Sequence, residues 1–228
     1  MENQSSLPRH IGLITDGNRR WAKSNGFPSL DGHKKGFEAG KKIVETAYDR
    51  GIKEFTAWAF STENWDRSKE EIDYLMALFE NWLDEFLKSF KDKNVKIRVV
   101  GQKWRVPLSL QKKIEQAERE TAGRDGMVFN LALSYGGRDE IVEGIKTIVK
   151  NGIIAGEINE NTVSDNIWLP DVDMIIRTGG EVRLSGFLAW QSTYAELFFI
   201  KKYLPDFTPE DFDAILAEYA QRQRRFGK

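Results

Sequence analysis

Short apolar runs alternate with longer amphipathic stretches along the whole chain, and this alternation is the feature that most restricts the fold. The apolar runs cover residues 10–15, 54–60, 95–101, 127–133, 174–177 and 195–200. The amphipathic stretches predict helices at 18–25, 32–50, 68–91, 109–122, 138–151 and 208–225. Strands that are apolar at nearly every position are typical of a parallel sheet covered by helices. We therefore expect an α/β fold with one mostly parallel sheet of about six strands.

Length and composition set further bounds. A chain of 228 residues without repeats or a low-complexity linker predicts a single domain, 1–228, with a polar tail at 1–9. The net charge of −1 gives no basic field for nucleic acid, so an anion site has to be local. Cysteine is absent and the only histidines are His10 and His33, which excludes disulfides, thiol catalysis and a multi-histidine metal site. Without a long apolar run or a signal peptide, we expect a cytoplasmic protein.

The sequence IGLITDGNRRWA contains the clearest signal for ligand binding. Its apolar half predicts a buried strand, and Asp16 and Gly17 follow at the carboxyl end, where open α/β sheets bind ligands. Gly17 allows backbone N–H groups to approach an anion, and Arg19 and Arg20 favour phosphate. A lone aspartate beside them indicates a Mg²⁺ ligand on that phosphate. The alternative is a helix cap next to two solvated arginines.

Two more polar clusters follow predicted strands. Ser61 and Asn64, in the sequence FSTENWDR, can form a proton-accepting network, or only a loop that starts a helix. In the sequence RTGGEVRLS, Arg177, Arg183 and a serine suit a second diphosphate. Glu196 enters an apolar run, where a carboxylate has to be paired or metal-bound, and a salt bridge to Arg177 or Arg183 is the simple alternative.

The predicted helix at 68–91 carries an unusually wide apolar stripe. Ser68 followed by Glu71 is typical of a capping-box start. At 1.5 Å per residue the helix would be about 36 Å long. It is either a long core helix or a helix that also lines an elongated apolar pocket with one flank.

The motifs taken together resemble the cis-prenyltransferase family, from about residue 10 to residue 227. The resemblance is carried by TDGNRRWA, GHKKG, AFSTENWDR, SYGGRDEI, IRTGGEVRLSGFLAWQ, YAELFF and RRFG. Gly-rich loops with basic residues are individually weak signals, but the motifs together, in this order, are highly specific to that family. The resemblance implies an apolar tunnel in the fold and Mg²⁺-dependent, repeated addition of isopentenyl diphosphate to an allylic primer, usually farnesyl diphosphate. The expected product is a cis-polyprenyl diphosphate, undecaprenyl diphosphate first.

The resemblance also assigns roles to residues. Asp16 would be the catalytic aspartate and a Mg²⁺ contact, Glu196 a second metal contact, and Asn64 the proton acceptor. The allylic diphosphate would be held by Gly17, Asn18, Arg19, Arg20, Trp21 and His33. The reacting region would be lined by Ser61, Thr62, Glu63, Trp65 and Arg67. Isopentenyl diphosphate would be held by Arg177, Arg183, Leu184 and Ser185.

Relatives further imply a homodimer, in which Glu196 and the C-terminal RRFG reach the partner's site, and membrane contact through the lipid product. The chain departs from the family at Ser29, where an arginine that contacts the allylic diphosphate is usual. Trp58 and Trp82 are bulky near the tunnel, so a shorter cis-prenyl diphosphate is the nearest alternative product. A non-catalytic partner subunit is the alternative of another class, although such relatives typically lack the aspartate and the paired arginines.

Overall fold

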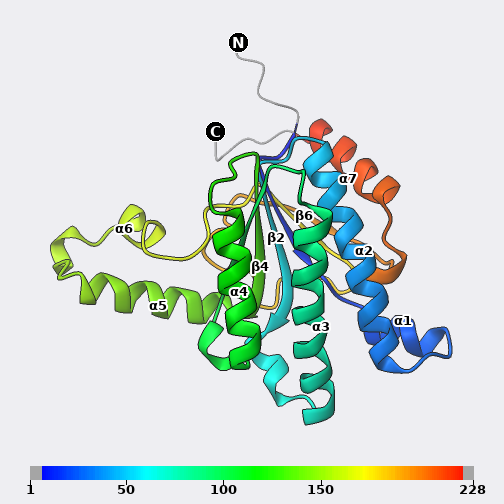
Figure 1. The fold of residues 1–228 in the computed structure, drawn as a ribbon. Coiled ribbons are helices and arrows are strands. Elements are labelled where there is room, and N and C mark those ends of the chain that lie inside the picture. Colours follow the sequence, from blue (N-terminus) through cyan, green and yellow to red (C-terminus); the bar gives the residue numbers. More distant parts are fainter. Residues whose placement is uncertain (1–6, 223–228) are drawn as a thin grey trace.

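Six strands form a single sheet in the computed structural model of the protein, which describes residues 7–222 (Figure 1). They are β1 (His10–Ile14), β2 (Glu54–Ser61), β3 (Val95–Val100), β4 (Met127–Tyr135), β5 (Met174–Arg177) and β6 (Glu196–Phe199). The order is β3-β4-β2-β1-β5-β6, and every pairing is parallel. The predicted α/β class, with its parallel sheet of six strands, is confirmed.

Helices connect the strands. They are α1 (Asn18–Ser24), α2 (Ser29–Asp49), α3 (Lys69–Ser89), α4 (Leu108–Thr121), α5 (Gly137–Lys150), α6 (Glu160–Ser164) and α7 (Pro209–Gln221). Short 3-10 turns lie at η1 (Thr62–Asp66), η2 (Lys103–Arg105), η3 (Ala155–Glu157) and η4 (Leu204–Asp206). All six predicted helices are present, and α6 is additional. The predicted end of the last helix at 225 lies outside the described residues.

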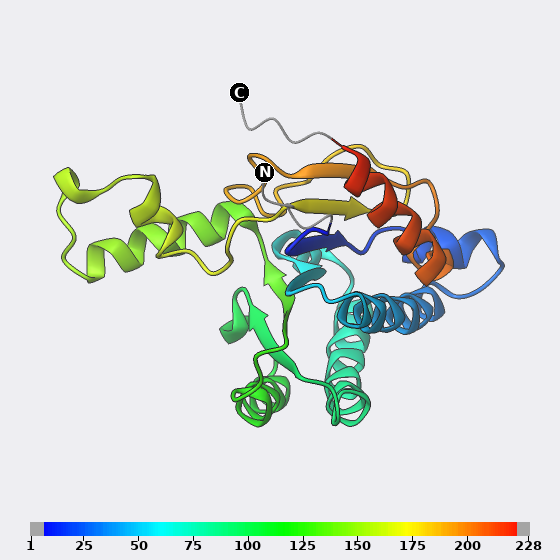
Figure 2. The ribbon, with the colours of Figure 1, turned by 90° about the horizontal axis from the view of Figure 1, so that it is seen from above.

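The sheet separates two apolar cores. Helices α2, α3, α4 and α7 lie along one face, where Leu13, Phe55 and Phe129 pack into the larger core (Figure 2). On the other face a smaller core forms around Trp58 and Phe187, and the segment between β5 and β6 covers it instead of a helix. The larger core therefore lies between the sheet and the long helices α2 and α3, and any space for an apolar ligand lies there too.

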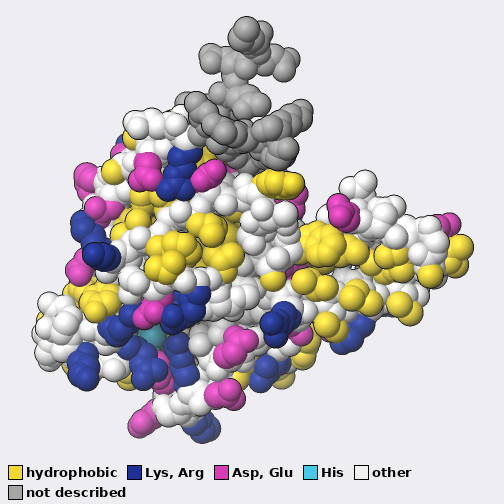
Figure 3. Space-filling view, turned by 180° about the vertical axis from the view of Figure 1, so that it is seen from behind, with side chains coloured by type: hydrophobic (Ala, Val, Ile, Leu, Met, Phe, Trp, Pro, Cys, Tyr) yellow, Lys and Arg dark blue, Asp and Glu magenta, His cyan; other side chains and the backbone are white. Residues whose placement is uncertain are grey.

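Helices α5 and α6 form an arm that extends away from the rest of the molecule (Figures 1 and 2). At its base Glu140 is 1% exposed and accepts hydrogen bonds from Tyr135 Oη and Gln191 Nε2. Val142, Ile145 and Val149 are spaced to share one side of α5, and all three are exposed. Figure 3 shows hydrophobic side chains along this arm. Within residues 7–222, none of the helices has the length and apolarity required to cross a membrane.

Candidate active site

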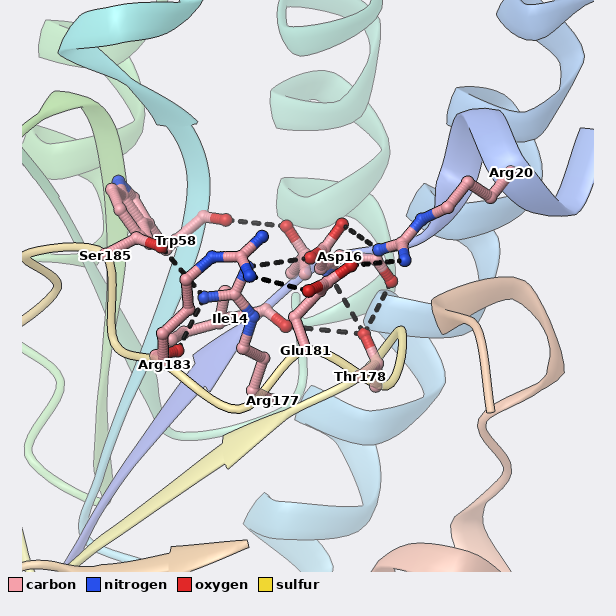
Figure 4. Close-up of polar contacts among 10 residues, drawn as sticks. Ile14, Asp16, Arg20, Trp58, Arg177, Thr178, Glu181, Arg183 and Ser185 are labelled. Carbon is pink, nitrogen blue, oxygen red and sulfur yellow. Dashed lines mark hydrogen bonds and ion pairs between the residues drawn. The ribbon is translucent and has the colours of Figure 1, made fainter. Parts of the chain in front are cut away.

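Asp16 lies two residues after β1 and is held between two arginines (Figure 4). Its Oδ1 accepts a hydrogen bond from Arg20 Nη2 at 3.0 Å, and its Oδ2 accepts one from Arg177 Nη2 at 2.9 Å. Arg177 ends β5, which pairs with β1, and its side chain is only 6% exposed. Two segments far apart in the sequence thus bring a carboxylate and two guanidinium groups together at the carboxyl edge of the sheet.

The backbone around Asp16 is fixed from two sides. Thr178 Oγ1 donates to the Asp16 carbonyl oxygen at 2.7 Å and lies 3.1 Å from the Asp16 backbone nitrogen. Gly17 has a φ of 103°, and a Cβ there would lie 2.5 Å from Tyr203 Cδ1. Because that φ and that contact both exclude a side chain, glycine is required at the turn that leads into α1.

The loop after β5 adds a further guanidinium group and a hydroxyl. Arg20 Nη1 donates to Glu181 Oε1 at 2.9 Å, and Arg183 Nη1 donates to Glu181 Oε2 at 2.6 Å. Arg177 Nη1 donates to Ser185 Oγ at 3.0 Å, whereas its Nε is buried and has no partner within the described residues. A buried guanidinium nitrogen without an acceptor is suited to an anionic ligand.

The loop after β2 is held by its own side chains. Asn64 Oδ1 accepts a hydrogen bond from the backbone N–H of Ser61 at 3.1 Å, which closes a capping box around η1. Trp65 donates from Nε1 to Ser134 Oγ at 2.8 Å and stacks under the Arg105 guanidinium at 4.9 Å. The Asn64 amide oxygen therefore keeps the loop in place at the same edge as Asp16.

Glu71, in the first turn of α3, contacts two arginines and a histidine. Its Oε1 accepts from Arg67 Nη1 at 3.0 Å and lies 3.1 Å from His33 Nε2, while its Oε2 lies 3.8 Å from Arg19 Nη1. Ser68 Oγ accepts from the Glu71 backbone N–H at 3.3 Å, so the predicted helix start is correct. The carboxylate half of the predicted capping box does not form in the described chain, because that carboxylate binds the cations instead.

Two hollows meet beside these residues. The first is a cavity of about 430 Å³ whose apolar lining includes Phe37, Trp82 and Phe129. The second is a polar hollow of about 680 Å³ lined by Arg19, Arg20 and Lys23. Both are lined by Thr15, Asp16, Asn18, His33 and Arg67. Figure 3 shows Lys and Arg side chains gathered around a histidine on one face. An apolar cavity that adjoins a cationic hollow suits an amphiphile with an anionic head group.

The charges at this junction perturb one another. Burial raises the pKa of Asp16, but hydrogen bonds from Arg177 and Arg20 outweigh burial and bring the pKa below its usual value. Burial lowers the pKa of His33, and the positive charge of Arg67 adds to this effect against the opposing hydrogen bond to Glu71. At pH 7 the Asp16 side chain is therefore ionised and His33 is neutral in the free protein.

Most of the predicted site residues line the two hollows. They are Asp16, Gly17, Asn18, Arg19, Arg20, His33, Ser61, Glu63, Asn64, Arg67, Arg177 and Ser185. Ser29, where the sequence departs from the family, also lines the polar hollow. Sequence analysis missed Thr178 and Glu181 as contacts and treated Glu71 as a helix cap only. The sequence signals that could have found two of them are short spacings: Glu181 lies two residues before Arg183, and Glu71 lies four residues after Arg67.

The remaining predicted residues have other surroundings. Trp21 stacks on Phe27 and donates to Asp206 Oδ1, and Leu184 packs on the smaller core. Thr62, Trp65 and Arg183 do not line either hollow among the described residues.

Glu196 lies at the other end of the sheet from Asp16. It pairs in register with Met174, which pairs with Ile11, so it lies level with the start of β1. Ile14, at the carboxyl end of β1, is about 10 Å further along. The Glu196 carboxylate pairs with Arg222 at 2.8 Å, so the expected alternative of a salt bridge to Arg177 or Arg183 is wrong. The motif RRFG lies outside the described residues.

The carboxylates of the site suit Mg²⁺ only if a substrate diphosphate supplies further oxygen ligands. Within residues 7–222 no group of three or more His, Cys, Asp or Glu side chains could hold a metal ion. Mg²⁺ is commonly bound by one or two carboxylates together with substrate phosphates and water. Asp16, next to a cationic hollow of a size that admits a diphosphate, satisfies that requirement.

Comparison with known proteins decides the family. A family model of undecaprenyl diphosphate synthases matches residues 14–227. The chain belongs to this family. It is 44% identical over 229 residues to a ditrans,polycis-undecaprenyl-diphosphate synthase, specific for (2E,6E)-farnesyl diphosphate, from Vibrio parahaemolyticus, covering 97% of this chain and 91% of the relative. It is 41% identical over 232 residues to a geranylgeranyl-diphosphate-specific tritrans,polycis-undecaprenyl-diphosphate synthase from Pyrococcus horikoshii, covering 97% and 88%.

A solved structure has the same fold. Lavandulyl diphosphate synthase from Lavandula x intermedia, in complex with dimethylallyl diphosphate, superposes with a TM-score of 0.94 at 38% identity. The match covers 99% of this chain and all of that one. The family member described here is thus a prenyltransferase of the undecaprenyl diphosphate synthase type, as the sequence motifs predicted.

Proposed function

We propose that this family member catalyses Mg²⁺-dependent, sequential condensation of isopentenyl diphosphate with an allylic diphosphate to give a cis-polyprenyl diphosphate. The observation that carries the proposal is the position of Asp16. Its carboxylate lies between Arg20 and Arg177 at the junction of an apolar cavity and a cationic hollow. A primer with an apolar tail and a diphosphate head matches both spaces at once.

Two separate anion sites are what the reaction requires. Arg19, Arg20 and His33 would hold the allylic diphosphate in the polar hollow, with Gly17 and Asn18 presenting backbone and amide groups. Arg177 and Arg183, with Ser185, would hold isopentenyl diphosphate. Anchoring each substrate by its own diphosphate aligns the attacking double bond with the allylic carbon. The buried, unpartnered Arg177 Nε supports this assignment.

Each condensation forms a carbon–carbon bond, releases the allylic diphosphate and removes one proton from the isopentenyl unit. The arginines stabilise the negative charge that develops on the leaving diphosphate. Mg²⁺, held by Asp16 and diphosphate oxygens, would supply further positive charge there. Ser61, Asn64 and Glu63 line the cavity beside Asp16, and we assign the proton-accepting position to Asn64. We assign Arg67, which lines both hollows, to the reacting region together with Thr62 and Trp65. Trp21 is assigned to the allylic diphosphate and Leu184 to isopentenyl diphosphate.

Farnesyl diphosphate is the proposed primer, and undecaprenyl diphosphate the first candidate product. The named relatives use either farnesyl or geranylgeranyl diphosphate. A shorter product is the second candidate, because of how the cavity is bounded. Phe37, Lys41 and Trp82 line both the cavity and a separate outer groove between α2 and α3, so they separate the two. A volume of about 430 Å³ lies in the lower part of the range for small-molecule pockets, about 300–1,000 Å³. A continuous tunnel would require this partition to open.

A homodimer would complete the site. The exposed apolar side of α5, with Val142, Ile145 and Val149, is a surface that a second copy of the chain can cover. Glu196 is too far along the sheet from Asp16 to bind the same ion in one chain, so a role as metal ligand requires the partner's site. We further propose a cytoplasmic protein with peripheral membrane contact through its lipid product. The alternative of a non-catalytic partner subunit does not account for Asp16 paired with Arg20 and Arg177.

The test is synthesis by the purified protein. Farnesyl diphosphate, radiolabelled isopentenyl diphosphate and Mg²⁺ are expected to give cis-polyprenyl diphosphates, whose lengths chromatography reports. Dimethylallyl, geranyl and geranylgeranyl diphosphate in parallel would identify the preferred primer. Absence of any elongated product with all four primers would refute the proposal.

A further inference from the structure

Glu71 has a charge arrangement that the proposed reaction does not explain. Its carboxylate contacts Arg19 from α1, His33 from α2 and Arg67 from the loop before α3. The Glu71 side chain is 13% exposed and the His33 side chain 7%, so this pair is largely shielded from water. All three partners line the polar hollow, and two of them also line the apolar cavity.

The cluster needs an anion when no substrate is bound. Burial lowers the pKa of Arg67, and the nearby positive charge of Arg19 lowers it further. The same two influences, burial and neighbouring arginines, act on His33. Without a counter-ion the Arg19 and Arg67 guanidinium groups would repel one another across the hollow. Glu71 supplies that counter-ion from within the protein and keeps the cationic side chains gathered.

The Glu71 carboxylate is negatively charged and therefore repels an incoming diphosphate. A diphosphate placed among Arg19, Arg67 and His33 would compete with Glu71 for the same N–H donors. The contact to Arg19 is the longest, at 3.8 Å, and the Arg19 side chain is 57% exposed. Arg19 is therefore the donor that can most easily exchange one anion for the other, and it shares the hollow with Ser29, which has no charge to offer.

We propose that Glu71 is an internal counter-ion that occupies the cation cluster of the free protein and gives up Arg19 and Arg67 to the diphosphate of the first substrate. The proposal rests on the proposed function, because it takes that substrate to be a diphosphate. It makes Glu71 a residue that sets the affinity for the primer, without contact to the reacting carbon atoms.

The proposal predicts opposite effects on two measurements. Glu71→Gln removes the counter-ion, so the free protein unfolds at a lower temperature. The same change removes the competing charge, so inorganic diphosphate binds more tightly, by on the order of tenfold or more, since one like charge within about 10 Å has at least that effect at an effective dielectric constant near 20. If Glu71 had a merely structural role, its substitution would weaken both folding and diphosphate binding.

Titration calorimetry with inorganic diphosphate, together with thermal unfolding, is the experiment. Glu70→Gln is the matched control, because Glu70 is exposed in the same helical turn and the substitution changes the net charge equally. Tighter binding for Glu71→Gln alone supports the proposal. Equal or weaker binding overturns it, even where the wild type synthesises prenyl diphosphates.

A second variant covers the case in which Glu71→Gln does not fold. Arg19→Gln, at an exposed position, is expected to weaken diphosphate binding several-fold, because Arg19 is the side chain that changes partner. Unchanged affinity in Arg19→Gln overturns the proposal. If neither the wild type nor any variant binds diphosphate, this proposal and the diphosphate sites of the proposed function are overturned together.

Discussion

Removal of the Asp16 carboxylate is expected to reduce the stability of the free protein as well as its activity. In Asp16→Ala the Arg177 guanidinium, whose side chain is 6% exposed, loses its carboxylate partner at 2.9 Å. A hydrogen bond to a charged group contributes about 1.5–3 kcal/mol, and the more exposed pair with Arg20 adds about 0–1 kcal/mol. Arg177 keeps its hydrogen bonds to Ser185 and to the Arg183 carbonyl, which limits the loss.

The expected total is about 2–3 kcal/mol, which for a domain of this size lowers Tm by about 5–10 °C. Thermal unfolding followed by circular dichroism measures the shift, and radiolabelled elongation assays measure turnover, which we expect to be abolished. Asp213→Ala is the matched control, because Asp213 pairs with Arg50 in an exposed ion pair far from the site. It is expected to change stability by about 1 kcal/mol or less and to leave activity intact. Full turnover in Asp16→Ala would show that the catalytic assignment is wrong, and an unchanged or higher Tm would refute the argument from Arg177.

Three further predictions concern the cavity, the pH dependence and the arm. Trp82→Ala is expected to open the partition between the cavity and the outer groove, so that chromatography shows longer products. Trp104→Ala, at an exposed position, is expected to keep the wild-type product length. Identical product lengths in both variants would contradict the role of Trp82 in the partition. Because the pKa of Asp16 is lower folded than unfolded, its stabilising contribution is complete above its unfolded-state pKa of about 3.9 and is lost as pH falls through the folded value. The difference in unfolding free energy between wild type and Asp16→Ala should stay constant from about pH 8 to pH 5 and shrink below about pH 4, and a difference that grows there would argue against the pairing. Val149→Lys is expected to shift the protein toward monomers in analytical ultracentrifugation, and an unchanged dimer would exclude this side of α5 from the interface.

The sequence was sufficient to predict the elements that bury apolar runs. The strand at 174–177 has the predicted bounds, and the helix predicted at 68–91 is present as Lys69–Ser89, with Ser68 as its N-cap. These predictions succeed because burial and capping are local properties of a segment. The sheet order was not predictable in the same way, since the sequence does not say that β5 joins the sheet beside β1.

What the sequence could not supply is the partner of each charged side chain. Glu71 fits a helix start, and its spacing from Arg67 indicates one ion pair. Nothing in the sequence indicates that the same carboxylate also contacts Arg19 from α1 and His33 from α2. Glu196 follows the arginine loop closely in the chain, but the parallel register of β6 carries it to the opposite end of the sheet. The helix α6 was missed because its five residues, ENTVS, are too few to show an apolar period.

Charged and apolar parts of the candidate site come from different kinds of structure. The groups around Asp16 lie at the carboxyl edge of the sheet, Arg177 at the end of β5 and Arg20 in the first turn of α1, whereas Phe37 and Trp82 lie in the middle of α2 and α3. Substitutions inside those helices can therefore change the size of the apolar cavity while the charged groups around Asp16 keep their positions. Relatives with this fold can therefore diverge in two independent properties. One is whether a given head group is bound, and the other is how long a hydrocarbon chain the cavity accommodates.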